Sequence, residues 1–166
     1  MKNILKNLDK TRQHLINEIV ELDFNQINFK PDVSQWSIGQ VCQHLIITEN
    51  LFSKAIKLGL AKESEPVELK PIEVILDRNF KKEVPDIAKP TDEQFTSALL
   101  IEELERSRKK FLKVLEIEDT TVFSKKSYPH PIFNDLLLIQ WVEFLDLHEQ
   151  RHTDQIRDIK TKIRGQ

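Results

Sequence analysis

Apolar residues recur at spacings of three and four over two long stretches near the start of the chain. The first stretch runs from about residue 4 to residue 22, and its stripe consists of Ile4, Leu8, Leu15, Ile19 and Leu22. The second stretch follows Trp36, and its stripe consists of Ile38, Val41, Leu45, Phe52 and Ile56. This spacing predicts two amphipathic helices. Ser37 and Gln40 fit a capping box at the start of the second helix, and Gly59 suits its C-terminal end.

Four prolines interrupt the pattern between residues 62 and 90, which predicts a long crossover with one short helix over residues 72–80. A third helix is expected from Thr91, whose partner Gln94 again fits a capping box. After an irregular stretch, Pro131 is expected in the first turn of a fourth helix that runs towards Ile163. No segment alternates convincingly as a strand would. The whole chain, residues 1–166, is therefore expected to be one all-α domain. It is predicted to be a four-helix bundle with the crossover between helices two and three, which could wall one end of a site.

Composition excludes several classes of protein. The chain of 166 residues is 39% hydrophobic and 31% charged, and only three residues are glycine. A formal net charge of −2 gives no basic field for nucleic acid. Polar residues interrupt every apolar run before it reaches the length of a membrane span, and the first residues lack the apolar centre of a signal peptide. The single cysteine, Cys42, excludes an internal disulfide and suits the reducing cytoplasm. We therefore expect a cytoplasmic protein that binds neither nucleic acid nor membrane.

The segment HEQRH, residues 148–152, raises the question of a metal site. His148 and His152 are four residues apart on the predicted fourth helix, about 40° apart around its axis and about 6 Å along it, so they could bind one ion. The spacing alone fits two unligated histidines equally well. A zinc protease needs a third ligand, and the residues after His152 contain no histidine or glutamate. Asp154 and Asp158 continue the same helix and cannot fold back over the ion, so the protease interpretation fails.

A third ligand is better sought upstream, at His44 on the second helix. If that helix packs on the fourth, His44, His148 and His152 could form a three-histidine site with one coordination position open, as in catalytic zinc centres. The competing interpretation makes His44 an ordinary histidine at the edge of the core, bonded to a carbonyl.

Other candidate residues receive lesser roles. Cys42 projects about 200° away from His44 and is expected to be a small core residue. Glu149 projects about 100° from His148, so it is expected to face solvent or a neighbouring helix and receives no catalytic role. His130 could line the pocket entrance, and Gln155 could reach the wall of the site, although packing is its simpler role. His14 is expected to be exposed.

Three motifs in this order resemble the DinB/YfiT-like superfamily of bacterial proteins. They are WSIGQVCQHL (residues 36–45), HPIFN (residues 130–134) and HEQRHTDQI (residues 148–156). Asn134 stands where the family usually has glycine. The resemblance covers nearly the whole chain and implies a four-helix bundle of down-up-up-down type. It also implies a divalent metal bound by His44, His148 and His152, with Zn or Ni as the expected ion, and homodimers are expected among such proteins.

The resemblance implies two kinds of activity. Characterised relatives resemble S-transferases that use a low-molecular-weight thiol such as bacillithiol, and others are regarded as metal-dependent hydrolases. We therefore expect a small-molecule substrate and an enzyme that activates a thiol or water at the metal. The alternative is a non-catalytic protein that binds metal or a small ligand in a stress response. Nothing in the sequence decides between these two functions.

Overall fold

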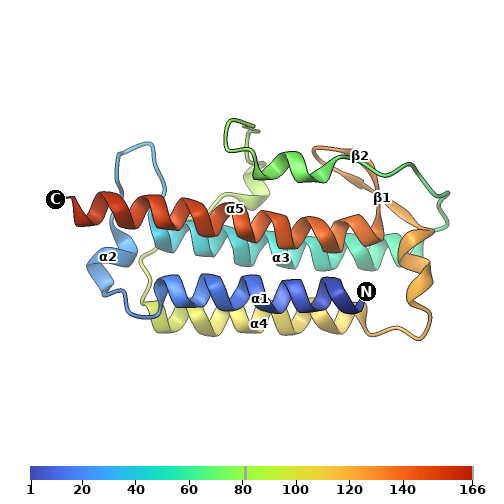
Figure 1. The fold of residues 1–166 in the computed structure, drawn as a ribbon, viewed down its shortest axis with the longest axis horizontal. Coiled ribbons are helices and arrows are strands. Elements are labelled where there is room, and N and C mark those ends of the chain that lie inside the picture. The colour runs from blue at the N-terminus through green and yellow to red at the C-terminus, as the bar shows by residue number, and fades with distance from the viewer. Residues whose placement is uncertain (81, 166) are drawn as a thin grey trace.

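The computed structural model describes residues 1–80 and 82–165 and is dominated by four long helices. These are α1 (Lys2–Ile19), α3 (Ile38–Ala61), α4 (Ser97–Leu115) and α5 (Leu138–Arg164). Figure 1 shows that α1 and α5 run in one direction and that α3 and α4 run in the opposite one, which is the down-up-up-down order predicted. Helix α3 packs against both α4 and α5, and α1 packs against α5. None of the helices within the described residues has the length and apolar character needed to cross a bilayer.

The start of α3 follows the local capping predicted from the sequence. Ser37 and Gln40 form the predicted capping box at α3, because the Ser37 hydroxyl accepts from the Gln40 amide at 3.2 Å and the Gln40 side chain accepts from the Ser37 amide at 3.1 Å. Helix α1 ends at Ile19, earlier than the predicted Leu22. A second capping box, between Asp23 and Gln26, opens the short helix α2 (Phe24–Asn28) and requires the chain to leave α1 before it.

The predicted start of α4 at Thr91 is wrong. The helix begins at Ser97, with Thr96 as its N-cap. The Thr91 amide instead donates to the side chain of Gln43 at 2.7 Å, and the backbone of Phe95 pairs with the Asn28 side chain. These long-range bonds satisfy the backbone polar groups that a helix would otherwise use, so the segment stays extended.

The predicted start of the last helix at Pro131 is also wrong, and the expectation of no strand fails here. Residues Ser127–His130 (β1) and Asn134–Leu137 (β2) form an antiparallel hairpin, and α5 begins directly after it. Asn134 has a φ of 57°. This left-handed conformation favours glycine and is tolerated by asparagine, so Asn134 can stand where the resemblance implies a glycine. The Trp141 indole donates to the Tyr128 carbonyl at 3.2 Å and ties the hairpin to α5.

The crossover occupies residues 62–96 and contains two short 3-10 helices, Ile72–Leu76 and Asp86–Ala88. The first of them lies inside the segment predicted to be helical. Two residues of α5 fasten the crossover to the bundle. The Gln140 side chain pairs with both backbone groups of Lys70, and the Arg151 guanidinium donates to the carbonyls of Ile75, Asp77 and Phe80. The crossover therefore lies against α5, as Figure 1 shows.

Two apolar clusters make up the core, and a layer of four buried charges lies between them. We call Arg12, Glu49, Arg108 and Glu149 the charge layer, because each of the four long helices contributes one of these residues. Arg12 donates to Glu149 at 2.8 Å and to Glu49 at 3.0 Å, and Arg108 donates to the same two carboxylates. The guanidinium of Arg12 also bonds the Leu104 carbonyl, and that of Arg108 bonds the Leu8 carbonyl. Two positive and two negative groups therefore balance inside the bundle.

The charge layer keeps Arg12 and Glu49 ionised despite their burial. Burial acts to lower the pKa of Arg12, but the adjacent carboxylates of Glu149 and Glu49 raise it above its ordinary value. Burial acts to raise the pKa of Glu49, but Arg12 and Arg108 lower it below its ordinary value. The net effect stabilises the charged form of both groups.

Replacing Arg12 with methionine should lower the free energy of unfolding by about 3 kcal/mol or more, because it leaves an uncompensated buried carboxylate. The matched control is Arg106→Met on α4. Arg106 is 57% exposed and pairs with Glu103 one turn away, so the control should change stability by less than about 0.5 kcal/mol. Urea denaturation followed by circular dichroism measures both values. Equal losses in the two variants would contradict a stabilising role of the charge layer.

Candidate metal centre

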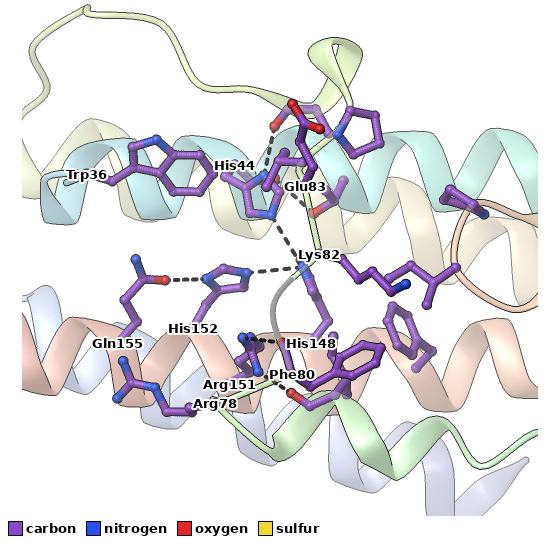
Figure 2. Close-up of a pocket in the computed structure, with 18 of the residues that line it drawn as sticks. Trp36, His44, Arg78, Phe80, Lys82, Glu83, His148, Arg151, His152 and Gln155 are labelled. Atoms are coloured by element: carbon purple, nitrogen blue, oxygen red, sulfur yellow. Dashed lines mark hydrogen bonds between the residues drawn. The ribbon is translucent and has the colours of Figure 1, made fainter. Parts of the chain in front are cut away.

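The structure brings His44, His148 and His152 together between α3 and α5, as Figure 2 shows. The Nε2 atom of His148 lies 3.3 Å from Nε2 of His44 and 3.1 Å from Nε2 of His152. One ligand nitrogen from each ring lies within 4.8 Å of the others, and all three side chains are buried. Among the described histidine, cysteine and carboxylate side chains, these three histidines form the cluster whose ligand atoms are close enough to share one metal ion. The three rings could therefore hold one ion.

Hydrogen bonds fix which nitrogen of two of these rings carries a proton. His44 Nδ1 lies 2.7 Å from the Ala88 carbonyl, and His152 Nδ1 lies 2.7 Å from the Gln155 side-chain oxygen. Both oxygens can only accept, so each Nδ1 donates its proton. In the neutral ring the Nε2 atom then carries a lone pair, and in both residues it faces His148. Metal-binding histidines commonly have such a partner on the opposite nitrogen.

Two of the three separations between the donor nitrogens fit a tetrahedral cation. Nitrogens that bind one Zn²⁺ at about 2.0–2.1 Å with tetrahedral angles lie roughly 3.3 Å apart. The two separations of 3.3 and 3.1 Å match this value. A proton on His148 Nε2 could bond only one of the two facing lone pairs well, and His148 Nδ1 is buried without a hydrogen-bond partner among the described residues. A shared cation would satisfy all three Nε2 atoms.

Burial keeps the three imidazoles neutral. It lowers the pKa of His44 more than the hydrogen bond to Ala88 raises it. Burial and the neighbouring His44 lower the pKa of His152 to about 3, and burial with the neighbouring His152 and His44 places the pKa of His148 well below its ordinary value. A histidine must be neutral to bind a metal. The rings are therefore in the form that binds metal at neutral pH.

The three histidines line a cavity of about 1110 Å³ between α3, α5, the crossover and the hairpin loop. Its aromatic wall consists of Phe52, Trp141 and Phe144. Among the described residues, the charged side chains that line the cavity are Arg78, Lys82, Glu83, Arg151, Asp158 and Lys162, and basic groups outnumber acidic ones in this set. Arg78 forms an ion pair with Asp158, and Arg151 donates hydrogen bonds to carbonyls of the crossover. The crossover forms one wall of the site.

The lesser candidates lie mostly where the sequence placed them. Cys42 is completely buried in the core, and its burial raises the pKa of the thiol to about 12. His14 is exposed. His130 lines the cavity but is 96% buried, since only 4% of its surface is exposed. Gln155 binds His152, which is a more specific role than the packing role expected.

Two features of the site could not be recognised from the sequence. Glu149 faces the neighbouring helices and belongs to the charge layer, although the sequence left solvent open as an alternative. The partner of His44 is a backbone carbonyl, that of Ala88, which no side-chain motif reports. The spacing of three between His152 and Gln155 was a usable signal, because residues at i and i+3 are neighbours on a helix.

Buried His130 should make the stability of the protein depend on pH. Burial lowers its pKa to about 4, whereas the unfolded chain has the ordinary histidine pKa of about 6.5. As the pH falls below about 6.5, the unfolded chain takes up a proton that the folded protein does not, so stability is lost between about pH 6.5 and 4. When the pH is lowered from 7.5 to 5, the free energy of unfolding of His130→Gln should fall by roughly 2 kcal/mol less than that of the wild type. Denaturant unfolding at both pH values measures this loss, and the exposed His14→Gln should match the wild type. An unchanged pH dependence in His130→Gln would contradict the assignment.

Known proteins resemble this chain over nearly its whole length. The sequence profile of the DinB superfamily matches residues 7–156. "Uncharacterized protein YuaE" of Bacillus subtilis (strain 168) is 30% identical over 159 residues, which cover 93% of this chain and 96% of that protein. A Bacillus cereus (strain AH820) protein named "Putative metal-dependent hydrolase" is 23% identical over 96% of this chain and 84% of its own.

Two solved structures share the fold. TT2238, described as a four-helix bundle protein, superposes with a TM-score of 0.64 at 16% identity and covers 95% of this chain and 98% of its own. YfiT from Bacillus subtilis, described as a probable metal-dependent hydrolase with an unusual four-helix bundle topology, also gives 0.64, at 15% identity, and covers 98% of this chain and 86% of its own. With its down-up-up-down bundle and its buried cluster of three histidines, this chain belongs to the DinB superfamily.

Proposed function

We propose that His44, His148 and His152 bind a divalent metal ion through their Nε2 atoms and that the protein is a metal-dependent hydrolase of a small molecule. The convergence of three neutral imidazoles, two of them held through Nδ1, is the observation that carries the proposal. The relatives named as metal-dependent hydrolases support the same assignment. Imidazole ligands suit Zn and Ni alike, and the two short separations from His148 Nε2 fit Zn²⁺.

The chemistry requires a bound ion and a dry, shaped cavity. His44, His148 and His152 would hold the ion, which when bound would act as a Lewis acid and lower the pKa of a water or thiol. The protein orients the ligands: the Ala88 carbonyl holds His44 and the Gln155 amide oxygen holds His152. The aromatic wall places an apolar surface beside His148, whose ring lies 6.0 Å from that of Phe144.

The size and charge of the cavity support thiol S-transfer as a second candidate reaction. Its volume of about 1110 Å³ exceeds the roughly 300–1,000 Å³ usual for a site that holds one small ligand. A transferase must hold a thiol and an acceptor together, so the additional volume suits this reaction. The excess of basic side chains would also attract an anionic low-molecular-weight thiol.

Metal content tests the ligand assignment. His44→Ala, His148→Ala and His152→Ala should each weaken metal binding by more than about 100-fold, because each removes a direct ligand. Gln155→Leu should weaken it by about 10- to 100-fold, since it removes only the partner of His152. His14→Ala should have no effect. Elemental analysis of protein purified without an affinity tag measures occupancy, and competition with a chelator measures affinity. Full occupancy in His44→Ala would exclude that residue from the site.

Turnover tests the proposed reaction. The metal-loaded protein should hydrolyse members of a panel of esters, amides and lactones without added thiol, and a chelator should abolish the rate reversibly. His148→Ala should lower kcat/KM by at least about 100-fold. Product that forms only in the presence of a low-molecular-weight thiol would favour the transferase. Stoichiometric metal without turnover over both panels would favour the non-catalytic binding protein.

A further inference from the structure

His130 has a buried N–H group for which the described residues supply no acceptor. The Ile132 amide donates to His130 Nδ1 at 3.1 Å, so Nδ1 must carry a lone pair. In the neutral ring the proton is then on Nε2. This atom is buried and has no hydrogen-bond partner among the described residues. A buried donor left unpaired destabilises a protein, so an unpaired donor in a ligand cavity is a candidate binding group.

The His130 ring is neutral because its surroundings are apolar. Burial lowers its pKa to about 4, so the ring is uncharged at physiological pH. In that form Nε2 can donate one hydrogen bond and cannot accept one. Its ligand must therefore present an acceptor, such as a carbonyl or ether oxygen, and a hydroxyl is suitable only through its oxygen.

Aromatic rings surround this donor. The His130 ring lies 4.5 Å from Trp141, 4.8 Å from Phe144 and 6.1 Å from Phe52, which together form the aromatic wall. The same wall extends to the metal centre, because Phe52 and Phe144 also lie 6.3 and 6.0 Å from the His148 ring. A group seated on this wall would lie between the three histidines and His130. An apolar, flat group fits such a surface.

We propose that His130 is a specificity-determining residue whose Nε2–H donates to an acceptor oxygen on an apolar group of the substrate. The aromatic wall holds that group, and the reacting centre lies towards His148. The substrate class is an aryl or similarly flat apolar molecule that carries an oxygen such as a ketone, ester or amide carbonyl. This inference rests on the proposed function, because it treats the bound molecule as a substrate. Its binding test does not require turnover.

Two isosteric ligands measure the contribution of the donor. Acetophenone carries a carbonyl oxygen, and α-methylstyrene carries a methylene group in its place. The Kd of each is measured by ligand-observed NMR titration with the wild type and with His130→Phe, which keeps an aromatic ring but has no N–H. In His130→Phe, the Kd of acetophenone should rise by about 10-fold relative to that of α-methylstyrene. The Kd of α-methylstyrene should be about the same for both proteins. Comparing ratios cancels the difference in hydrophobicity of the two ligands.

The wild type alone supplies a second measurement in case His130→Phe does not fold. In imidazole ¹H–¹⁵N spectra, acetophenone should move the Nε2–H proton of His130 downfield, and α-methylstyrene should not. A ratio that changes by less than 2-fold, or a proton that does not move, would overturn the proposal. The faces of Trp141 and Phe144 would then satisfy the N–H as a weak contact to the rings.

The outcomes for His130 and for the proposed function are separable. His130 lies outside the three-histidine cluster, so His130→Phe should keep the metal content of the wild type. Metal-dependent turnover with an unchanged Kd ratio would overturn the role of His130 and leave the proposed function intact. A shifted ratio in a protein that turns over no ester, amide or thiol acceptor would support the binding role and overturn the enzyme.

Discussion

The charge layer at the middle of the bundle is the constraint on which the rest of the structure depends. Apolar side chains can slide past one another at little cost, whereas two guanidinium groups and two carboxylates that meet in a dry core have one good arrangement. Arg12 and Glu149 join α1 to α5, and Arg108 and Glu49 join α4 to α3. The diagonal bonds Arg12–Glu49 and Arg108–Glu149 complete the network. A slip of one turn in any helix would leave a charge buried and unpaired.

This fixed axial register positions the histidines. Glu149 follows His148 directly, and Glu49 lies five residues after His44, or about 7.5 Å along α3. Because Arg12 and Arg108 each bind both glutamates, they fix the height of α3 relative to α5. The Nε2 atoms of His44 and His148 can then lie 3.3 Å apart, although these two residues are 104 positions apart in the sequence. The charge layer therefore orders the site by fixing the helices that carry the histidines.

The parts of the structure that follow from local sequence could be predicted, and those that depend on distant partners could not. The stripes of α1 and α3, the Ser37 cap and the pairing of His148 with His152 all arise within one or two helical turns. The sequence offered His44 as a third ligand only if its helix packs on the last one, and the family resemblance implied the same set of three. The charge layer escaped prediction because single charged residues far apart in sequence suggest solvated helix faces. The hairpin escaped it because four-residue strands leave almost no alternation. The start of α4 depends on Gln43 and Asn28, which lie about 50 and 70 residues away.

The topology itself explains why a cavity forms over the histidines. Helices α3 and α4 run in the same direction, so the chain must return along the whole of α3, about 36 Å for its 24 residues. Residues 62–96 are far more than the roughly eleven extended residues that this distance requires. The surplus lies against α5 as short 3-10 helices, held by Gln140 and Arg151, and reaches His44 at Ala88. A connection that the helix order makes obligatory thus supplies both the wall of the cavity and the carbonyl that orients His44. The crossover is therefore as much a part of the site as the helices that carry the histidines.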